Sequence, residues 1–289
     1  MPKERLPVVP SRLQRPQESD VAMSMTRPPS VAVLLMSRLR WRHTPWALER
    51  LARGPSAWPV VRGLRFAQVL GSGWGGGFGL WPGLNYQGIF AAFDAEDAAH
   101  EFATASEVAQ AYRHRSLEHF GAVLACTSSR GSWSGHTMAQ HTDSTSQAQP
   151  DAADDHPIAA LTRASIRPRR AVQFWRHAPA THQALAQAAG CRVAVGLGEA
   201  PLLRQATFSV WDSAQKMHAY ARRGAHQTAI EAAWGDGLFS ESMFVRFRPL
   251  WLAGNWAGMS VTRGDAPDAS AKRGPSPGIQ DLLQGLPHG

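Results

Sequence analysis

Cysteine is scarce in this sequence, which contains two among 289 residues, Cys126 and Cys191. Neither has a second cysteine or a histidine at metal-ligand spacing, which argues against a disulfide scaffold and against a sequence-evident zinc or iron–sulfur site. So few cysteines suit a reducing compartment, and a cytoplasmic location is therefore expected.

Long apolar runs are also missing. The longest, Val31–Met36, is far shorter than the ~20 residues of a membrane-spanning helix. Residues 1–30 lack the continuous apolar stretch of a secretory signal, so neither membrane insertion nor secretion is expected. The composition, 44% apolar and 18% charged, is nevertheless that of a globular protein.

Acidic residues are outnumbered, and the net charge is +8. Three polar segments read as unpacked: a tail over 1–29, an acidic linker over 136–157 and a tail over 263–289. The first tail contributes +2, the linker −4 and the second tail nothing, so +10 falls on the blocks 30–135 and 158–262. This charge favours acidic partners, such as nucleic acid, anionic lipid or an acidic protein.

The two blocks repeat each other. FAAFDAEDAAHEF (90–102) aligns with FSVWDSAQKMHAY (208–220) at an offset of 118, and GSWSG (131–135) with GNWAG (254–258) at 123. Leu70-Gly71-Ser72-Gly73 further resembles Val195-Gly196-Leu197-Gly198 at 125. Three matches in the same order favour an internal duplication.

Each block reads as strand, helix, strand, strand, helix, strand, the split ferredoxin-like motif. Asp94 and Asp212 are the expected N-caps of the later helices, and Gly54 the expected end of the first helix. We therefore predict an α+β fold in which tandem ferredoxin-like units press their open sheet faces together, as in a dimeric α/β barrel. A pocket between sheet and helices would suit a flat, apolar ligand.

Two other patterns have plain interpretations. The glycine-rich GSGWGGGFG (71–79) has no following Gly-Lys-Ser/Thr and opens no helix, so we predict a loop, or a cover over the pocket, rather than a phosphate site. Arginines interleave with tryptophans around Trp41 and over 163–175. We interpret these arginines, Arg163 included, first as solvated faces; a membrane-surface or carboxylate-binding role is the alternative.

Histidine is the remaining candidate for chemistry, because no serine nucleophile elbow, HExxH motif or Cys–His pair is present. His226 follows Arg222, Arg223 and Gly224, where the helix begun near Asp212 should break, in a predicted pocket wall. His218, eight residues earlier, is the competing candidate ligand. A lone histidine is more often structural or exposed, so spacing alone leaves both choices open.

Longer segments carry a resemblance. ALTRASIRPRRAVQFWRHAPA (160–180), VGLGEAPLLRQATFSVWDSAQKMHAYARRGAH (195–226) and GLFSESMFVRFRPLWLAGNWAG (237–258), with LGSGWGGGF and SSRGSWSG in the first block, resemble the spheroidene monooxygenase family. The resemblance implies a haem-dependent oxygenase that introduces a C-2 keto group into acyclic carotenoids, converting spheroidene to spheroidenone. Its co-substrates would be O₂ and reduced ferredoxin.

That resemblance gives the histidine a role. Oxidising an unactivated C–H bond needs a metal cofactor, here haem b, with His226 as the expected iron ligand and His218 as the alternative. Arg204, Arg222 and Arg223 are candidate partners of the haem propionates. Two oxidations at one carbon, followed by loss of water, would yield the ketone. No catalytic side chain is assigned.

The expected substrate bears on where the protein acts, and two alternative functions stay open. A carotenoid resides in the membrane, so a peripheral position on the photosynthetic membrane is expected, with no nucleic-acid partner. Another haem reaction on the same barrel, such as aldoxime dehydration, is one alternative. A non-catalytic basic haem- or lipid-binding protein is the other.

Overall fold

The computed structural model describes residues 28–77, 81–141, 156–200, 202–222 and 237–260. In the first half, strand, helix, strand, strand, helix, strand is the order found, with one additional helix. Its elements are β1 (Val31–Leu39), η1 (Trp41–His43), α2 (Thr44–Arg53), η2 (Gly54–Ala57), β2 (Leu64–Gly73), η3 (Trp74–Gly76), β3 (Pro82–Phe93), α3 (Glu96–Ala105), α4 (Glu107–Arg115) and β4 (Ser116–Gly131).

The second half follows the same order with fewer described helices. Its elements are β5 (Ile158–Ile166), η4 (Pro168–Arg170), α5 (Ala171–Ala186), β6 (Cys191–Ala200), β7 (Arg204–Trp211), α6 (Ala214–Ala221), β8 (Phe239–Trp256) and the short β9 (Met259–Ser260).

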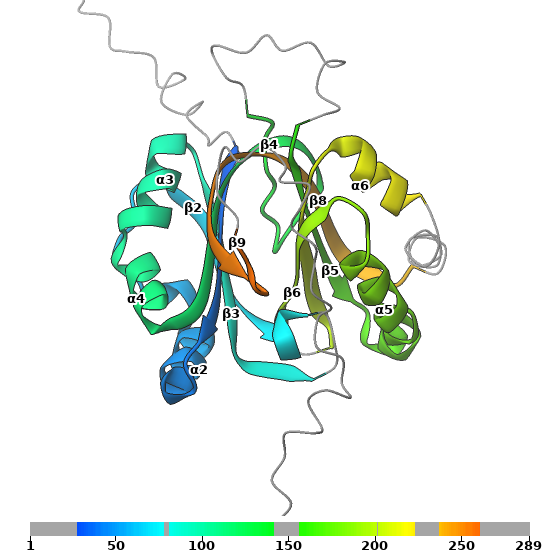
Figure 1. Cartoon of the computed structure of the whole chain (residues 1–289), viewed down its shortest axis with the longest axis horizontal. Helices are drawn as coiled ribbons and strands as arrows, with labels where there is room; N and C mark the ends of the chain where they lie inside the picture. Colours follow the sequence, from blue (N-terminus) through cyan, green and yellow to red (C-terminus); the bar gives the residue numbers. More distant parts are fainter. Residues whose placement is uncertain (1–27, 78–80, 142–155, 201, 223–236, 261–289) are drawn as a thin grey trace, which may run out of the picture.

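The strands form one antiparallel sheet that closes into a barrel. Their order is β4-β1-β3-β2-β6-β7-β5-β8-β9, and β4 also pairs with β8. The β4–β8 seam is long, whereas β2 and β6 meet at the single pair Gly71 and Gly198. Figure 1 shows the strands around a common centre, with α2, α3 and α4 on one flank and α5 and α6 on the other. The predicted α+β class is confirmed.

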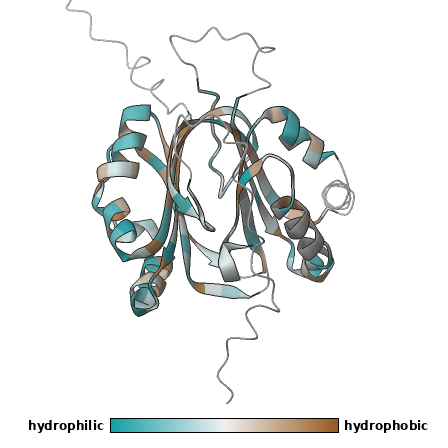
Figure 2. Cartoon of the chain, in the orientation of Figure 1, coloured by the Kyte–Doolittle hydropathy of each residue, from teal (hydrophilic) through white to brown (hydrophobic). Residues whose placement is uncertain are grey.

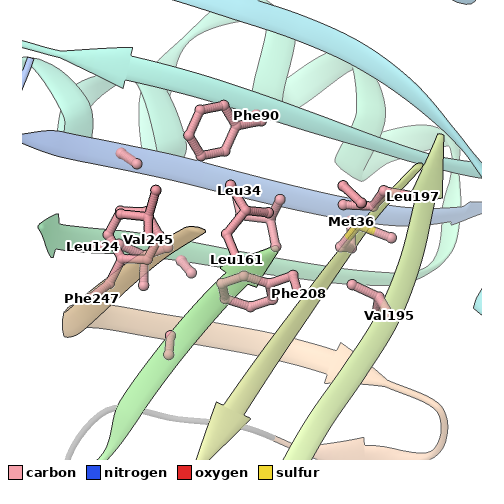
Figure 3. Packing of buried hydrophobic residues seen from close by; sticks show 14 of the residues in the cluster. Leu34, Met36, Phe90, Leu124, Leu161, Val195, Leu197, Phe208, Val245 and Phe247 are labelled. Carbon is pink, nitrogen blue, oxygen red and sulfur yellow. The ribbon is translucent and has the colours of Figure 1, made fainter. Parts of the chain in front are cut away.

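Apolar side chains from both halves fill the barrel. Figure 3 shows Leu34 and Phe90 of the first half facing Leu161 and Phe208 of the second, and all four are fully or almost fully buried. In β8 the predicted alternation is confirmed, because Val245 and Phe247 point inward while Arg246 and Arg248 are exposed. Figure 2 shows many hydrophilic residues on the helices that flank the barrel. The interior is thus a packed core.

The two halves share their closing turns as well as their strand order. Trp133 and Trp256 are both buried within the interior cluster. Each is followed by a residue with positive φ, Ser134 at 51° and Ala257 at 52°. Glu241 accepts a hydrogen bond from the Gly135 amide, and Glu118 accepts one from the Gly258 amide. Each of these residues lies 123 positions from its equivalent in the other half, which is the offset of the GSWSG and GNWAG match.

One predicted alignment needs a new register. Gln87 and Gln205 are equivalent at the offset of 118, and they pair with Gly71 and Gly198 respectively. The equivalent glycines are therefore Gly71 and Gly198, 127 residues apart, instead of the pairing at 125. Sequence similarity between short glycine-rich segments could not fix the register, because hydrogen-bond pairing sets it.

Two predicted helix caps are wrong. Asp94 lies before the N-cap position, which Ala95 occupies, and its carboxylate faces Arg65 instead. Asp212 precedes the N-cap Ser213, whose hydroxyl accepts from the Lys216 amide. Asp212 forms ion pairs with Arg192 and Lys216. The expected end of α2 at Gly54 is confirmed by the positive φ of 59° at that glycine.

Two segments are more ordered than the sequence suggested. The missed helix α4 begins immediately after Ser106, whose side chain accepts from the Ala109 amide and caps it. The predicted linker packs against the barrel over residues 136–141, where Met138 is buried and the His141 amide donates to the Cys126 carbonyl. Residues 142–155 of that linker lie outside the described residues, as do both predicted tails apart from 28–29.

Candidate functional site

The outward face of the first half-sheet carries large aliphatic side chains. Strand pairing places Leu35 opposite Ile89, and Ile89 opposite Val69, in one row across β1, β3 and β2. All three are at most 5% exposed, in a cluster that includes residues of α2, α3 and α4. In this half, helices and sheet bury each other without leaving the row open to solvent.

The equivalent row of the second half is made of small residues. Thr162 of β5 pairs with Thr207 of β7, which pairs with Gly196 of β6. Thr207 stands where the repeat places Ile89, and both threonines are half-buried although they lie at the middle of a sheet. Leucine, isoleucine and valine in one half thus become two threonines and a glycine in the other.

The neighbouring rows on this face are similar. Ala160, Ser209 and Ala194 form the row on one side. Ala164, Gln205 and Gly198 form the row on the other. Apart from Gln205, the side chains at these positions of β5, β7 and β6 are short; we call this surface the small-residue face.

Helices α5 and α6 lie over this flank of the barrel (Figure 1). Met217 of α6 packs with Trp211 and Cys191 at the end of the face where β7 finishes. At the opposite end, the Trp175 indole of α5 donates to the Leu202 carbonyl at 2.9 Å. The helices are therefore anchored at both ends of the strands, and the row of Ala160 and Ala194 packs against the Met217 cluster, which leaves the row of Thr162, Thr207 and Gly196 between the anchors.

The predicted site residues lie around this flank where they are described. His218 is on α6 and is half-buried. Arg222 caps the C-terminus of α6 and is exposed. Arg204 begins β7, with its guanidinium 3.8 Å from Glu199. His226 and Arg223 fall outside the described residues. Among described residues, no group of three or more His, Cys, Asp or Glu is placed to hold a metal ion.

Arg163 corrects the prediction of a solvated arginine face. Its side chain is 1% exposed and points into the barrel, where Glu199 and Glu241 bind the guanidinium. Its Cζ lies 5.6 Å from the ring centre of Trp133. The carboxylate-binding alternative holds here, but the carboxylates belong to the protein itself.

Glu241 connects this arginine to the turn at 132–135. Burial opposes its ionisation, but the Gly135 amide, the Ser132 hydroxyl, the Ser134 amide and Arg163 outweigh that effect and lower its pKa to about 2. The carboxylate is therefore charged at neutral pH. It holds the turn that carries the buried Trp133.

Sequence reasoning missed the small-residue face, although a signal was present. The repeat alignment that matches Phe90 with Phe208 also places Ile89 beside Thr207. Comparing outward positions between the repeats would have revealed the loss of volume. The inward position of Arg163 was also readable, because residues two apart share a strand face and Leu161 is a core residue.

The glycine-rich segment contributes to β2 and η3, with 78–80 outside the described residues. Its backbone opens no α-helix, so the rejection of a phosphate site is consistent with the structure. Ser72 Oγ donates to the Gly196 carbonyl, which ties the end of β2 to the small-residue face. Among described helices, none has both the length and the apolar character to cross a membrane.

Comparisons with known proteins place the chain in a family. Spheroidene monooxygenase of Rubrivivax gelatinosus is 47% identical over 228 residues, which cover 79% of this chain and 85% of that protein. The chain belongs to the spheroidene monooxygenase family. A second member, from Rhodobacter capsulatus, is 33% identical, with 74% of this chain and 87% of that protein covered. The resemblance found in the sequence is confirmed, although no family model matches.

Solved structures give weaker likenesses. One aldoxime dehydratase is 11% identical with a TM-score of 0.49, covering 76% of this chain and 80% of its own. Another, in complex with butyraldoxime, is 10% identical with a TM-score of 0.48, covering 76% and 79%. Such values bear on neither the chemistry nor the ligands of this chain.

Proposed function

We propose that this chain is a carotenoid monooxygenase that binds haem b against the small-residue face and introduces a C-2 keto group into spheroidene or a related acyclic carotenoid. Membership in the spheroidene monooxygenase family supports the reaction class. O₂ is the oxidant and reduced ferredoxin the electron donor. In this proposal the barrel is a tandem pair of ferredoxin-like units, of which only the second binds the cofactor.

The observation that carries the cofactor site is the loss of side-chain volume at Thr162, Thr207 and Gly196. A tetrapyrrole is flat and wide, and it needs a surface without large projecting side chains. The half-buried threonines belong to β5 and β7, in the half of the barrel whose flank carries α5 and α6, and His218 is on α6. In the first half, Leu35, Ile89 and Val69 fill the equivalent volume, so one haem per chain is expected.

The proposed contacts divide between sheet and helices. The small-residue face would support one side of the macrocycle, and His226 is the proposed iron ligand, with His218 as the alternative. Arg204, Arg222 and Arg223 are proposed partners of the propionates, because guanidinium groups pair well with carboxylates. Bound haem would supply the O₂ activation that no side chain provides. No described residue is assigned a proton-transfer role.

A visible spectrum tests the cofactor. The purified chain, supplemented with haem, should show a Soret band. His226→Ala should lose haem during gel filtration, while His218→Ala should retain it. Loss in His218→Ala with retention in His226→Ala would move the ligand to α6, and a wild-type chain without a Soret band would contradict the haem site.

Pigment analysis tests the reaction. Cells that accumulate spheroidene should convert it to the 2-keto product when they co-express the wild-type chain, and should fail to do so with His226→Ala. Haem binding with unchanged pigment would contradict the carotenoid reaction and favour another haem enzyme or a haem-binding protein.

A further inference from the structure

Three exposed tryptophans gather on the first half. Trp41, Trp74 and Trp81 are 55%, 58% and 80% exposed. The rings of Trp41 and Trp74 are 6.5 Å apart between centroids, and the Trp74 amide donates to the Trp81 carbonyl at 2.9 Å. We call Trp41, Trp74 and Trp81 the tryptophan patch. Large aromatic rings grouped in solvent are uncommon on a monomer and mark interaction sites.

The backbone beneath the patch is held tightly. Gly76 has a φ of +76°, and a Cβ at this position would lie 2.6 Å from the ring of the buried Trp256. Gly83 leaves similarly little room, since its Cβ would lie 2.6 Å from the Gly73 carbonyl oxygen. The ends of the connection between β2 and β3 therefore pack closely against the barrel and against each other.

The fold itself does not need this patch. In the second half the corresponding connection is shorter, since β6 ends at Ala200 and β7 begins at Arg204. In the first half β2 ends at Gly73 and β3 begins at Pro82. The longer connection adds Trp74 and Trp81 to a topology that closes without them.

Two arginines lie beside Trp41, at one edge of the patch. Arg40 and Arg42 flank Trp41, and neither forms an ion pair with a carboxylate in the part of the chain that the structure describes. Arg40 donates to the His114 carbonyl, and Arg42 donates to the His43 ring. The pKa of His43 lies below its usual value, first through burial and then through Arg42, Arg115 and Arg40. The local potential is thus positive.

We propose that the tryptophan patch, with Arg40 and Arg42, docks the chain on a bilayer that contains anionic lipid. Indole rings favour the boundary between headgroups and acyl chains, and arginine side chains pair with lipid phosphates. The patch also lies beside the proposed cofactor site, because η3 contacts β6 (Figure 1) and Gly71 pairs with Gly198. On this surface the chain could take its carotenoid directly from the bilayer. That step rests on the proposed function, whereas the contact with lipid does not.

Vesicle co-sedimentation tests the docking surface with lipid alone. The full chain is mixed with vesicles of phosphatidylcholine, with or without phosphatidylglycerol. The wild type should partition preferentially onto the anionic vesicles, and salt should weaken this binding. Trp74→Ser/Trp81→Ser should lower the partition coefficient about tenfold or more. Arg42→Gln should lower it about fivefold on anionic vesicles and little on neutral ones.

Val60→Ser is the matched control, since Val60 is fully exposed and precedes the opposite end of β2. This variant should bind within about twofold of wild type. Equal binding by all variants, or no binding by the wild type, would overturn the proposal. Loss of ferredoxin binding in Arg42→Gln with intact vesicle binding would also overturn it and assign the surface to the electron donor. Neither outcome alters the haem spectrum, so the two proposals fail separately.

Discussion

The two halves of the barrel share a strand order but differ in the sheet face that meets the helices. In the first half, Leu35 and Ile89 are buried under α2, α3 and α4. In the second half, Thr162 and Thr207 occupy the same row and are half-buried. The difference lies on the outward face, because the inward residues of both halves form one apolar core. The outward face is therefore filled by large side chains in the first half and lined by small ones in the second, where we propose that haem binds.

The seam shows what the halves kept in common. Glu118 and Glu241 each accept an amide hydrogen bond from the turn that follows a buried tryptophan. These contacts join the halves and close the barrel, so a change in either half would disturb both. Positions on the outward face have no such constraint, which explains how one face could lose volume without opening the barrel.

The largest expected effect concerns the row of large aliphatic side chains in the first half, to which Leu35 belongs. Leu35→Ala should lower the free energy of unfolding by about 3 kcal/mol, because it opens a cavity in a fully buried cluster. Thr162→Ala, at the equivalent position, should cost less than about 1 kcal/mol, because its side chain is short and half-buried. Urea unfolding of both variants measures the comparison. Equal losses would mean that the two rows are equally packed.

The next effect concerns the seam. Glu241→Gln should destabilise the chain by about 2 kcal/mol at pH 7, since it weakens the contact with the buried Arg163. Glu118→Gln should cost less, because its partner Arg38 is 42% exposed.

The pH dependence of Glu241→Gln follows from the lowered pKa. The folded value is about 2 and the ordinary value 4.5, so ionised Glu241 stabilises the fold above pH 4.5. That contribution is lost as the pH falls from 4.5 toward 2. Thermal unfolding of wild type and variant should therefore converge in acid, and a constant difference across this range would contradict the assignment.

The smallest expected effect concerns helix caps. Ala95 and Ser213 are equivalent N-caps, and only Ser213 has a side chain that accepts a backbone hydrogen bond. Ser213→Ala should cost about 1 kcal/mol, and Ala95→Ser should stabilise the chain by a smaller amount, about 0.5 kcal/mol. Chemical unfolding measures both changes. A neutral result at both positions would show that neither helix end depends on its cap.

Much of the fold was readable from the sequence because two segments of the chain show the same residue pattern. Two copies of one pattern fix element order better than either alone, and the alternation around Val245 and Phe247 identified a core strand. Helix α4 was missed because Ser106 both ends α3 and caps α4, so two helices follow each other without a loop. The alternation with Leu161 marked Arg163 as an inward residue, but its partners Glu199 and Glu241 are distant in the sequence, so local patterns did not reveal how its charge is compensated.

The candidate site was only partly predictable. Its place between sheet and helices followed from the barrel, and the histidines followed from elimination of other chemistry. The volume at Thr162 and Thr207 depended on strand register, which the sequence alone aligned imperfectly. His226 and Arg223 lie outside the described residues, so their roles remain predictions.

The central claim is that haem binds against the small-residue face. Haem titration of two variants that exchange the equivalent residues Ile89 and Thr207 tests it most directly. Thr207→Ile introduces the first half's residue into the small-residue face, and Ile89→Thr makes the reverse change in the filled face. Thr207→Ile should weaken haem binding at least about tenfold while the chain stays folded, because the added bulk occupies the proposed ligand space. Ile89→Thr should destabilise the chain but leave the haem affinity of the folded protein unchanged. Wild-type haem affinity in Thr207→Ile would contradict the account.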